Sequence, residues 1–190
     1  MVEKRKTKNE NPKGSEYLYF EKQLDHYCLK HAINNLFGRK LVTIEMLESQ
    51  VDEMYKIYKG AMPKSELKTS IGDYQIQVGT LLLEKEYCIR REEKFATWEY
   101  YEGNNLFVGY LINIRGGDGH YVSVKHKDRA FYYMESKSNG PELCTKGDIM
   151  NRLEDEDLEI FSVWLNKDID PWNKSILQHL VNVNTFSDSF

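Results

Sequence analysis

The apolar residues of this chain follow a helical spacing in the first half of the sequence and a strand-like pattern in the second half. In three early segments they recur at roughly every third or fourth position, which places them on one face of a helix. We expect helices over residues 28–37, 44–58 and 74–85, and a loop over 64–70. Thr43 is a suitable N-cap for the second helix, and Gly38 a suitable terminator for the first.

The second half is richer in short runs of β-branched and aromatic residues, which are typical of strands. We expect strands over residues 87–91, 106–114, 120–125, 130–135 and 159–165. Two further helices are expected over 148–157 and 172–183. Helices followed by strands predict an α+β fold.

Two of these strands, 120–125 and 130–135, are expected to form an antiparallel hairpin. If its turn is centred between Lys127 and Asp128, His120 faces Glu135 across the ladder, with Cβ atoms ~4.5 to 5.5 Å apart. A three-residue loop would shift this register by one position. In the first register, a carboxylate accepts from the His120 ring and fixes the orientation of that imidazole.

The composition is that of one folded domain. The chain has 190 residues, of which 41% are hydrophobic and 29% charged, with 26 basic against 30 acidic side chains and a net charge of −4. This balance argues against non-specific nucleic-acid binding. No apolar run approaches the ~20 residues that span a bilayer, so no membrane partner is expected. We divide the chain into a flexible basic arm (1–15), a folded domain (16–183) and a tail (184–190).

The three cysteines, Cys28, Cys88 and Cys144, are widely spaced and include no C-x-x-C pair. A disulfide scaffold or a structural zinc site is therefore not expected, and a reducing compartment is favoured. Cys28 falls in the first turn of its helix, where free N–H groups and the helix dipole stabilise a thiolate. Together with an oriented His120, this position suggests a Cys–His–carboxylate triad.

The residues around Cys28 also resemble a known family. Between Phe20 and Leu36, Gln23 stands five residues before Cys28, and the pattern C-x-x-H-x-x-N-N follows from that cysteine. This resembles the opening signature of the Josephin-domain deubiquitinases, closest to the short stand-alone Josephin proteins. Later segments resemble other family blocks in the same order: residues 71–78, 120–124 and 132–137.

The resemblance implies a papain-like cysteine peptidase, with the active site between a helical lobe and a sheet lobe. It would hydrolyse the bond after the C-terminal glycine of ubiquitin, without metal or organic cofactor. By this resemblance Cys28 is the nucleophile, His120 the general base and Gln23 an oxyanion donor. His31 lies one turn along the same helix as Cys28, so we expect it to support packing or hydrogen bonding. Glu135 stands where the family pattern leads us to expect Asn or Asp.

The expected partners are ubiquitin or polyubiquitin conjugates, and the expected state is a monomer in the cytoplasm or nucleus. Two alternatives remain open at this point. One is a non-catalytic ubiquitin-binding module, and the other a thiol hydrolase or transferase that acts on a ubiquitin-like modifier. A metal site at Cys28 and His31 is disfavoured, because no further Cys or His stands at a suitable spacing.

Overall fold

A computed structural model describes most of the folded domain expected over 16–183. The described residues are 18–58, 61–70, 72–92, 104, 106–115, 119–154 and 157–166. The expected basic arm (1–15), the expected helix over 172–183 and the tail lie outside them. Within the described ranges, no helix is long and apolar enough to cross a bilayer.

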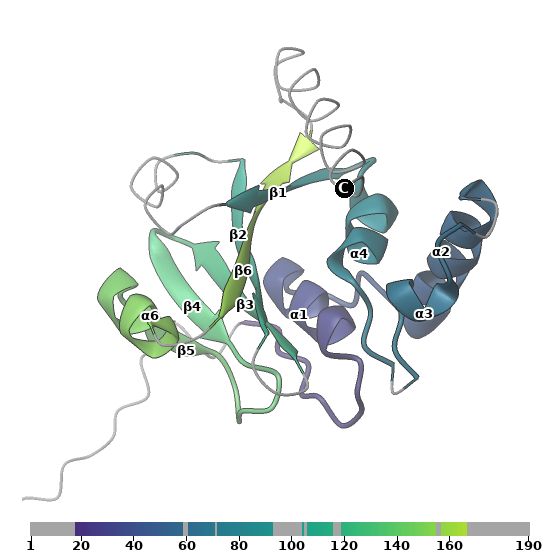
Figure 1. The fold of residues 1–190 in the computed structure, drawn as a ribbon. Helices are drawn as coiled ribbons and strands as arrows, with labels where there is room; N and C mark the ends of the chain where they lie inside the picture. The colour runs from purple at the N-terminus through teal and green to yellow at the C-terminus, as the bar shows by residue number, and fades with distance from the viewer. Residues whose placement is uncertain are drawn as a thin grey trace, which may run out of the picture.

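The described elements are five helices and six strands, shown in Figure 1. The helices are α1 (Cys28–Phe37), α2 (Ile44–Ile57), α3 (Lys64–Leu67), α4 (Ile76–Leu83) and α6 (Lys146–Leu153). The strands are β1 (Tyr87–Glu92), β2 (Phe107–Ile114), β3 (His120–Lys127), β4 (Ala130–Met134), β5 (Glu142–Cys144) and β6 (Leu158–Leu165).

The strands form a single six-stranded sheet in the order β1-β6-β2-β3-β4-β5, with every neighbouring pair antiparallel. Helix α1 packs on β2 and β3 and lies between the sheet and the other early helices, while α6 lies on the opposite face (Figure 1). The predicted α+β fold is confirmed.

Alternate residues of the central strands serve two separate cores. In β2, Leu111 packs with the residues of α1, α2 and α4, whereas Tyr110 and Ile112 pack with those of α6. This follows from the two-residue period of a strand, which sends neighbouring side chains to opposite faces. The sheet is thus covered on both sides, which explains why β2 reads as a nearly continuous apolar run.

Gly109 allows α1 to lie close to the sheet. It has a φ of 147° at an irregularity in the β2–β6 ladder. A Cβ added there would lie 2.1 Å from the carbonyl oxygen of Val124 and 2.8 Å from Leu36 Cδ1 of α1. Only a residue without a side chain fits between the helix and the neighbouring strand.

The helix boundaries follow the expected signals. Thr43 accepts a hydrogen bond from the Met46 backbone N–H at the start of α2, and Gly38 ends α1 in a left-handed conformation. The expected loop over 64–70 was wrong, because α3 forms a single turn there, and β5 was not predicted. Elements of four and three residues are too short to show a periodic pattern.

The β3–β4 hairpin exists, but the expected register was wrong. Its turn is formed by Asp128 and Arg129, both with positive φ, and Lys127 pairs with Ala130. These angles are typical of a two-residue type I′ turn. The turn lies one residue later than expected, so the pairing is displaced by two residues. A displacement of two keeps every side chain on the expected face.

Candidate active site

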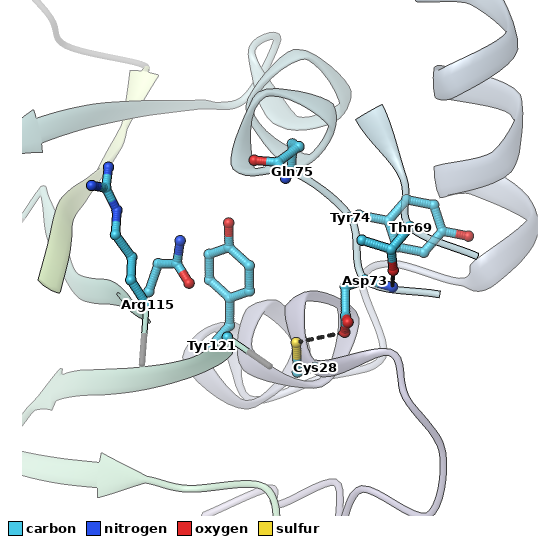
Figure 2. A pocket seen from close by; sticks show the side chains of 9 residues that line it. Cys28, Thr69, Asp73, Tyr74, Gln75, Arg115 and Tyr121 are labelled. Atoms are coloured by element: carbon cyan, nitrogen blue, oxygen red, sulfur yellow. Dashed lines mark hydrogen bonds between the residues drawn. The ribbon is translucent and has the colours of Figure 1, made fainter. Parts of the chain in front are cut away.

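The N-terminus of α1 places Cys28 at the edge of a cavity of about 240 Å³. Its side chain is only 3% exposed. The cavity is lined by Cys28, Thr69, Asp73, Tyr74, Gln75, Asn113, Arg115, Gly119 and Tyr121 (Figure 2). The helical lobe therefore supplies one wall, and the ends of β2 and β3 supply the other.

The Cys28 thiol is held in a protonated state by its surroundings. Burial raises its pKa to about 11, and the nearby charge of Asp73 adds to the shift. The sulfur donates to Asp73 Oδ1 at 3.6 Å (Figure 2). Backbone N–H groups of Tyr121 and Leu29 act in the opposite direction, because they favour the thiolate. The helix N-terminus alone does not produce the low thiol pKa that we expected from the sequence.

His120 and Glu135 form a close pair. His120 Nε2 lies 2.7 Å from Glu135 Oε1, which also accepts from the Lys137 backbone N–H at 2.9 Å. Burial opposes ionisation of Glu135, but these two hydrogen bonds outweigh it and lower its pKa. An ionised Glu135 takes the Nε2 proton as its hydrogen bond, which leaves Nδ1 as the basic nitrogen of a neutral ring.

This contact was expected, but it forms by a different route. In the observed register Glu135 lies beyond the end of β4 and diagonal to His120 rather than opposite it. Diagonal neighbours in antiparallel strands are ~7–8 Å apart, which long side chains can bridge. The extra methylene of Glu135, compared with Asp or Asn, supplies that reach.

Cys28 and the His120–Glu135 pair lie near each other without a direct hydrogen bond between them. Gly119 and Tyr121, on either side of His120 in the chain, both line the cavity that holds Cys28. Among the hydrogen bonds of the described residues, the thiol donates to Asp73 and none joins it to His120. His120 therefore stands at the end of a strand that borders the cavity, although His120 and Glu135 are not among the residues that line it.

Gln23 is fixed by both of its amide atoms. Ser136 Oγ donates to Gln23 Oε1 at 2.8 Å, and Gln23 Nε2 donates to the carbonyl of Asp25 at 2.6 Å. The Gln23 backbone N–H also donates to the Ser136 carbonyl at 2.8 Å. An amide nitrogen carries two hydrogens, so one remains for another acceptor. Ser136 directly follows Glu135 in the chain, so its hydrogen bonds to Gln23 link Gln23 to the segment that carries Glu135.

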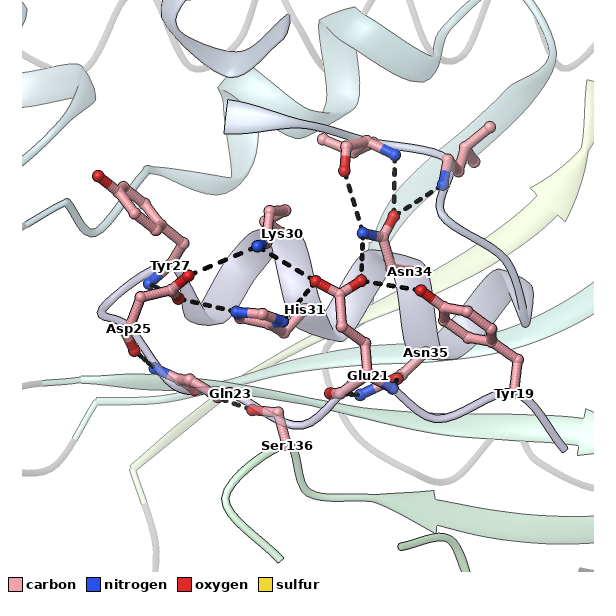
Figure 3. A network of polar contacts seen from close by, with 12 residues as sticks. Tyr19, Glu21, Gln23, Asp25, Tyr27, Lys30, His31, Asn34, Asn35 and Ser136 are labelled. Atoms are coloured by element: carbon pink, nitrogen blue, oxygen red, sulfur yellow. Dashed lines mark hydrogen bonds and ion pairs between the residues drawn. The ribbon is translucent and has the colours of Figure 1, made fainter. Parts of the chain in front are cut away.

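Gln23 belongs to a segment, residues 18–27, that we call the strap because it runs along α1 (Figure 3). Glu21 ties the strap to the helix: its backbone N–H and carbonyl both bond the side chain of Asn35, and its carboxylate accepts from Asn34 Nδ2 at 2.7 Å. Asn34 also accepts from the backbone N–H groups of Leu41 and Val42. The paired Asn residues of the sequence motif are therefore structural.

His31 contacts two carboxylates of the strap. Its Nε2 is 2.7 Å from Asp25 Oδ1, and its Nδ1 is 2.8 Å from Glu21 Oε1, an ion-pair distance without good hydrogen-bond alignment. Lys30 also contacts both carboxylates, at 3.1 and 3.6 Å (Figure 3). Both ring nitrogens of His31 are engaged with carboxylates, which agrees with the supporting role expected for it.

Sequence reasoning missed Asp73 and Glu21. Asp73 stands in the 71–78 block, and its residue type gave no sign of a contact with Cys28, which is 45 positions away. Glu21 lies among other charged residues, so its burial was not visible.

The chain is similar in sequence to known proteins. The Josephin family model matches residues 23–164. A curated relative, the Ataxin-3 homolog of Caenorhabditis briggsae, is 26% identical over 162 residues, which cover 81% of this chain and 50% of that protein. The chain thus spans about half the length of this relative.

Proposed function

The chain belongs to the Josephin family, which is generally one of cysteine proteases and deubiquitinases, and from this premise we propose that it is a deubiquitinase. Cys28 is the nucleophile, His120 the general base and then acid, Glu135 the residue that orients His120, and Gln23 an oxyanion donor. One observation carries the proposal: an imidazole–carboxylate pair stands on the strand whose neighbouring residues line the cavity that holds Cys28.

In the proposed reaction, Cys28 loses its proton to His120 Nδ1, and the thiolate attacks the carbonyl of the terminal glycine of ubiquitin. Gln23 Nε2 and the Cys28 backbone N–H stabilise the oxyanion. His120 then gives its proton to the departing lysine amine, and water hydrolyses the acyl-enzyme. No step requires a metal or an organic cofactor.

A non-catalytic ubiquitin-binding module is the second candidate function. The raised pKa of Cys28 favours it, because few thiol groups are ionised at neutral pH. The close His120–Glu135 pair favours the enzyme, since binding alone does not require an oriented imidazole. The three free thiols support a reducing compartment, the cytoplasm or nucleus, for either function.

The deciding experiment is incubation with ubiquitin that carries a thiol-reactive C-terminal group, read by intact mass. We expect one covalent adduct in the parent protein and none in Cys28→Ala. A ubiquitin-like modifier with the same reactive group serves as the specificity control. Ubiquitin binding without an adduct would establish the binding module, and an adduct with the modifier alone would redirect the substrate.

A further inference from the structure

The side chain of Asp73 is aimed at the Cys28 sulfur by a closed turn. Thr69 and Asp73 form two hydrogen bonds: the Thr69 backbone N–H donates to the Asp73 carbonyl at 2.8 Å, and the Asp73 backbone N–H donates to Thr69 Oγ1 at 3.0 Å. Figure 2 shows the carboxylate pointing toward the sulfur from this turn. The Sγ–Oδ1 contact therefore comes from a braced backbone and not from a freely moving side chain.

Gly72 brings this turn close to the start of α1. It has a φ of 101°, and a Cβ added there would lie 2.8 Å from Cε1 of Tyr27. Tyr27 is the N-cap residue of α1, directly before Cys28. Because Gly72 rests on the Tyr27 ring, the next residue of the turn, Asp73, is placed beside the next residue of the helix, Cys28.

Among the described residues of the cavity, no positively charged side chain pairs with the Asp73 carboxylate. The Arg115 guanidinium pairs with Glu159 at 2.5 Å, and His120 pairs with Glu135. Burial raises the pKa of the Tyr121 phenol, so this cavity-lining group is neutral at ordinary pH. Asp73 is thus the one charged side chain among the described residues in direct contact with the sulfur.

We propose that Asp73 is a positioning residue that holds Cys28 in its protonated form and so restrains the nucleophile. The thiol donates its hydrogen to the carboxylate, and ionisation of the sulfur would break that bond and bring two negative charges together. The restraint deepens the proposed function, since it regulates the residue assigned as nucleophile. The proposal rests on the contact between Asp73 and Cys28, which does not involve ubiquitin.

The test is the pH dependence of Cys28 alkylation by iodoacetamide in Asp73→Asn, located by peptide mass spectrometry. Asn has nearly the same shape without the charge, so we expect the midpoint for Cys28 to fall by about one pH unit. A fall of one unit raises the thiolate fraction about tenfold at neutral pH, but it also lowers thiolate nucleophilicity about threefold. Alkylation at pH 7 should therefore become about three- to fourfold faster.

Asp52→Asn is the matched control, because it makes the same charge change on the exposed face of α2, where Asp52 pairs with Lys64. In this variant the pH midpoint for Cys28 alkylation should equal that of the parent protein. Asp73→Ser provides a second removal of the carboxylate if the Asn variant does not fold. An unchanged midpoint in a folded Asp73 variant overturns the proposal. Because iodoacetamide needs no ubiquitin site, this result is separable from failure of the deubiquitinase assignment.

Discussion

The strap and the cavity both lie against α1, and each brings carboxylates against that helix. In the strap, Glu21 is met by Asn34, Asn35, Lys30 and His31, so nearly every polar atom has a partner (Figure 3). In the cavity, Asp73 has the weak thiol donor of Cys28 as its partner.

This difference predicts that the strap affects the stability of the fold and that the cavity affects the reactivity of Cys28. A buried polar group that is fully paired fixes one conformation, whereas a charge without a counter-charge perturbs its neighbours. We infer that substitutions in the strap change the free energy of unfolding, and that substitutions around the cavity change the chemistry of the thiol. The comparison can be tested from both sides.

The largest expected effect is on the strap side. Asn34→Ala removes the acceptor for the buried backbone N–H groups of Leu41 and Val42 and a donor to Glu21. Each unsatisfied group costs ~1–3 kcal/mol, so we expect a loss of about 4 kcal/mol in the free energy of unfolding. Urea denaturation measures it. Asn139→Ala, which removes only an exposed bond to Lys22, should cost less than about 0.5 kcal/mol. Equal losses in the two variants would contradict the structural role of the strap.

The next largest effect belongs to the catalytic side. Glu135→Ala leaves His120 without its carboxylate partner. We expect kcat/KM for a ubiquitin substrate to fall about 100-fold, equivalent to about 2.7 kcal/mol. Glu135→Asp and Glu135→Asn should keep measurable activity below that of the parent protein, because each retains an acceptor for the imidazole N–H but is one methylene shorter. Equal rates for Glu135→Ala and the parent protein would remove Glu135 from the proposed triad.

The smallest effect is a dependence of stability on acid pH. Burial opposes ionisation of Glu21 and Asp25, but the bonds from Asn34, His31 and their neighbours outweigh it and lower both pKa values. A carboxyl group with a lowered pKa in the folded state stabilises the fold above its ordinary pKa. That stabilisation is lost as the pH falls below the ordinary values of 4.5 and 3.8.

Urea denaturation at a series of pH values checks this prediction. Glu21→Gln should flatten the dependence, because one of the two titrating groups is then absent. Asp52→Asn removes a carboxylate from an exposed ion pair, so this variant should keep more of the pH dependence of the unfolding free energy. A profile in Glu21→Gln as steep as that of the parent would show that other carboxylates carry the acid sensitivity.

Much of the fold was predictable, because it depends on local signals. The apolar stripe from Cys28 to Phe37 and the stop at Gly38 predicted α1 to the residue. The β3–β4 hairpin was also predictable, but its register was not, since Arg129 stands at the second turn position, where Gly usually supplies the positive φ. The His120–Glu135 contact was anticipated through the wrong pairing and forms because a two-residue displacement preserves the face.

The order of the elements, the place of Cys28 at a helix N-terminus and membership of the Josephin family could be read from the residues alone, since they depend on residues close together in the chain. The surroundings of the Cys28 thiol depend on the three-dimensional fold. Asp73 reaches it because Gly72 packs on Tyr27, and burial in the cavity opposes the helix dipole. Desolvation and charge act through space, so the ionisation of a side chain depends on neighbours that its sequence position does not reveal.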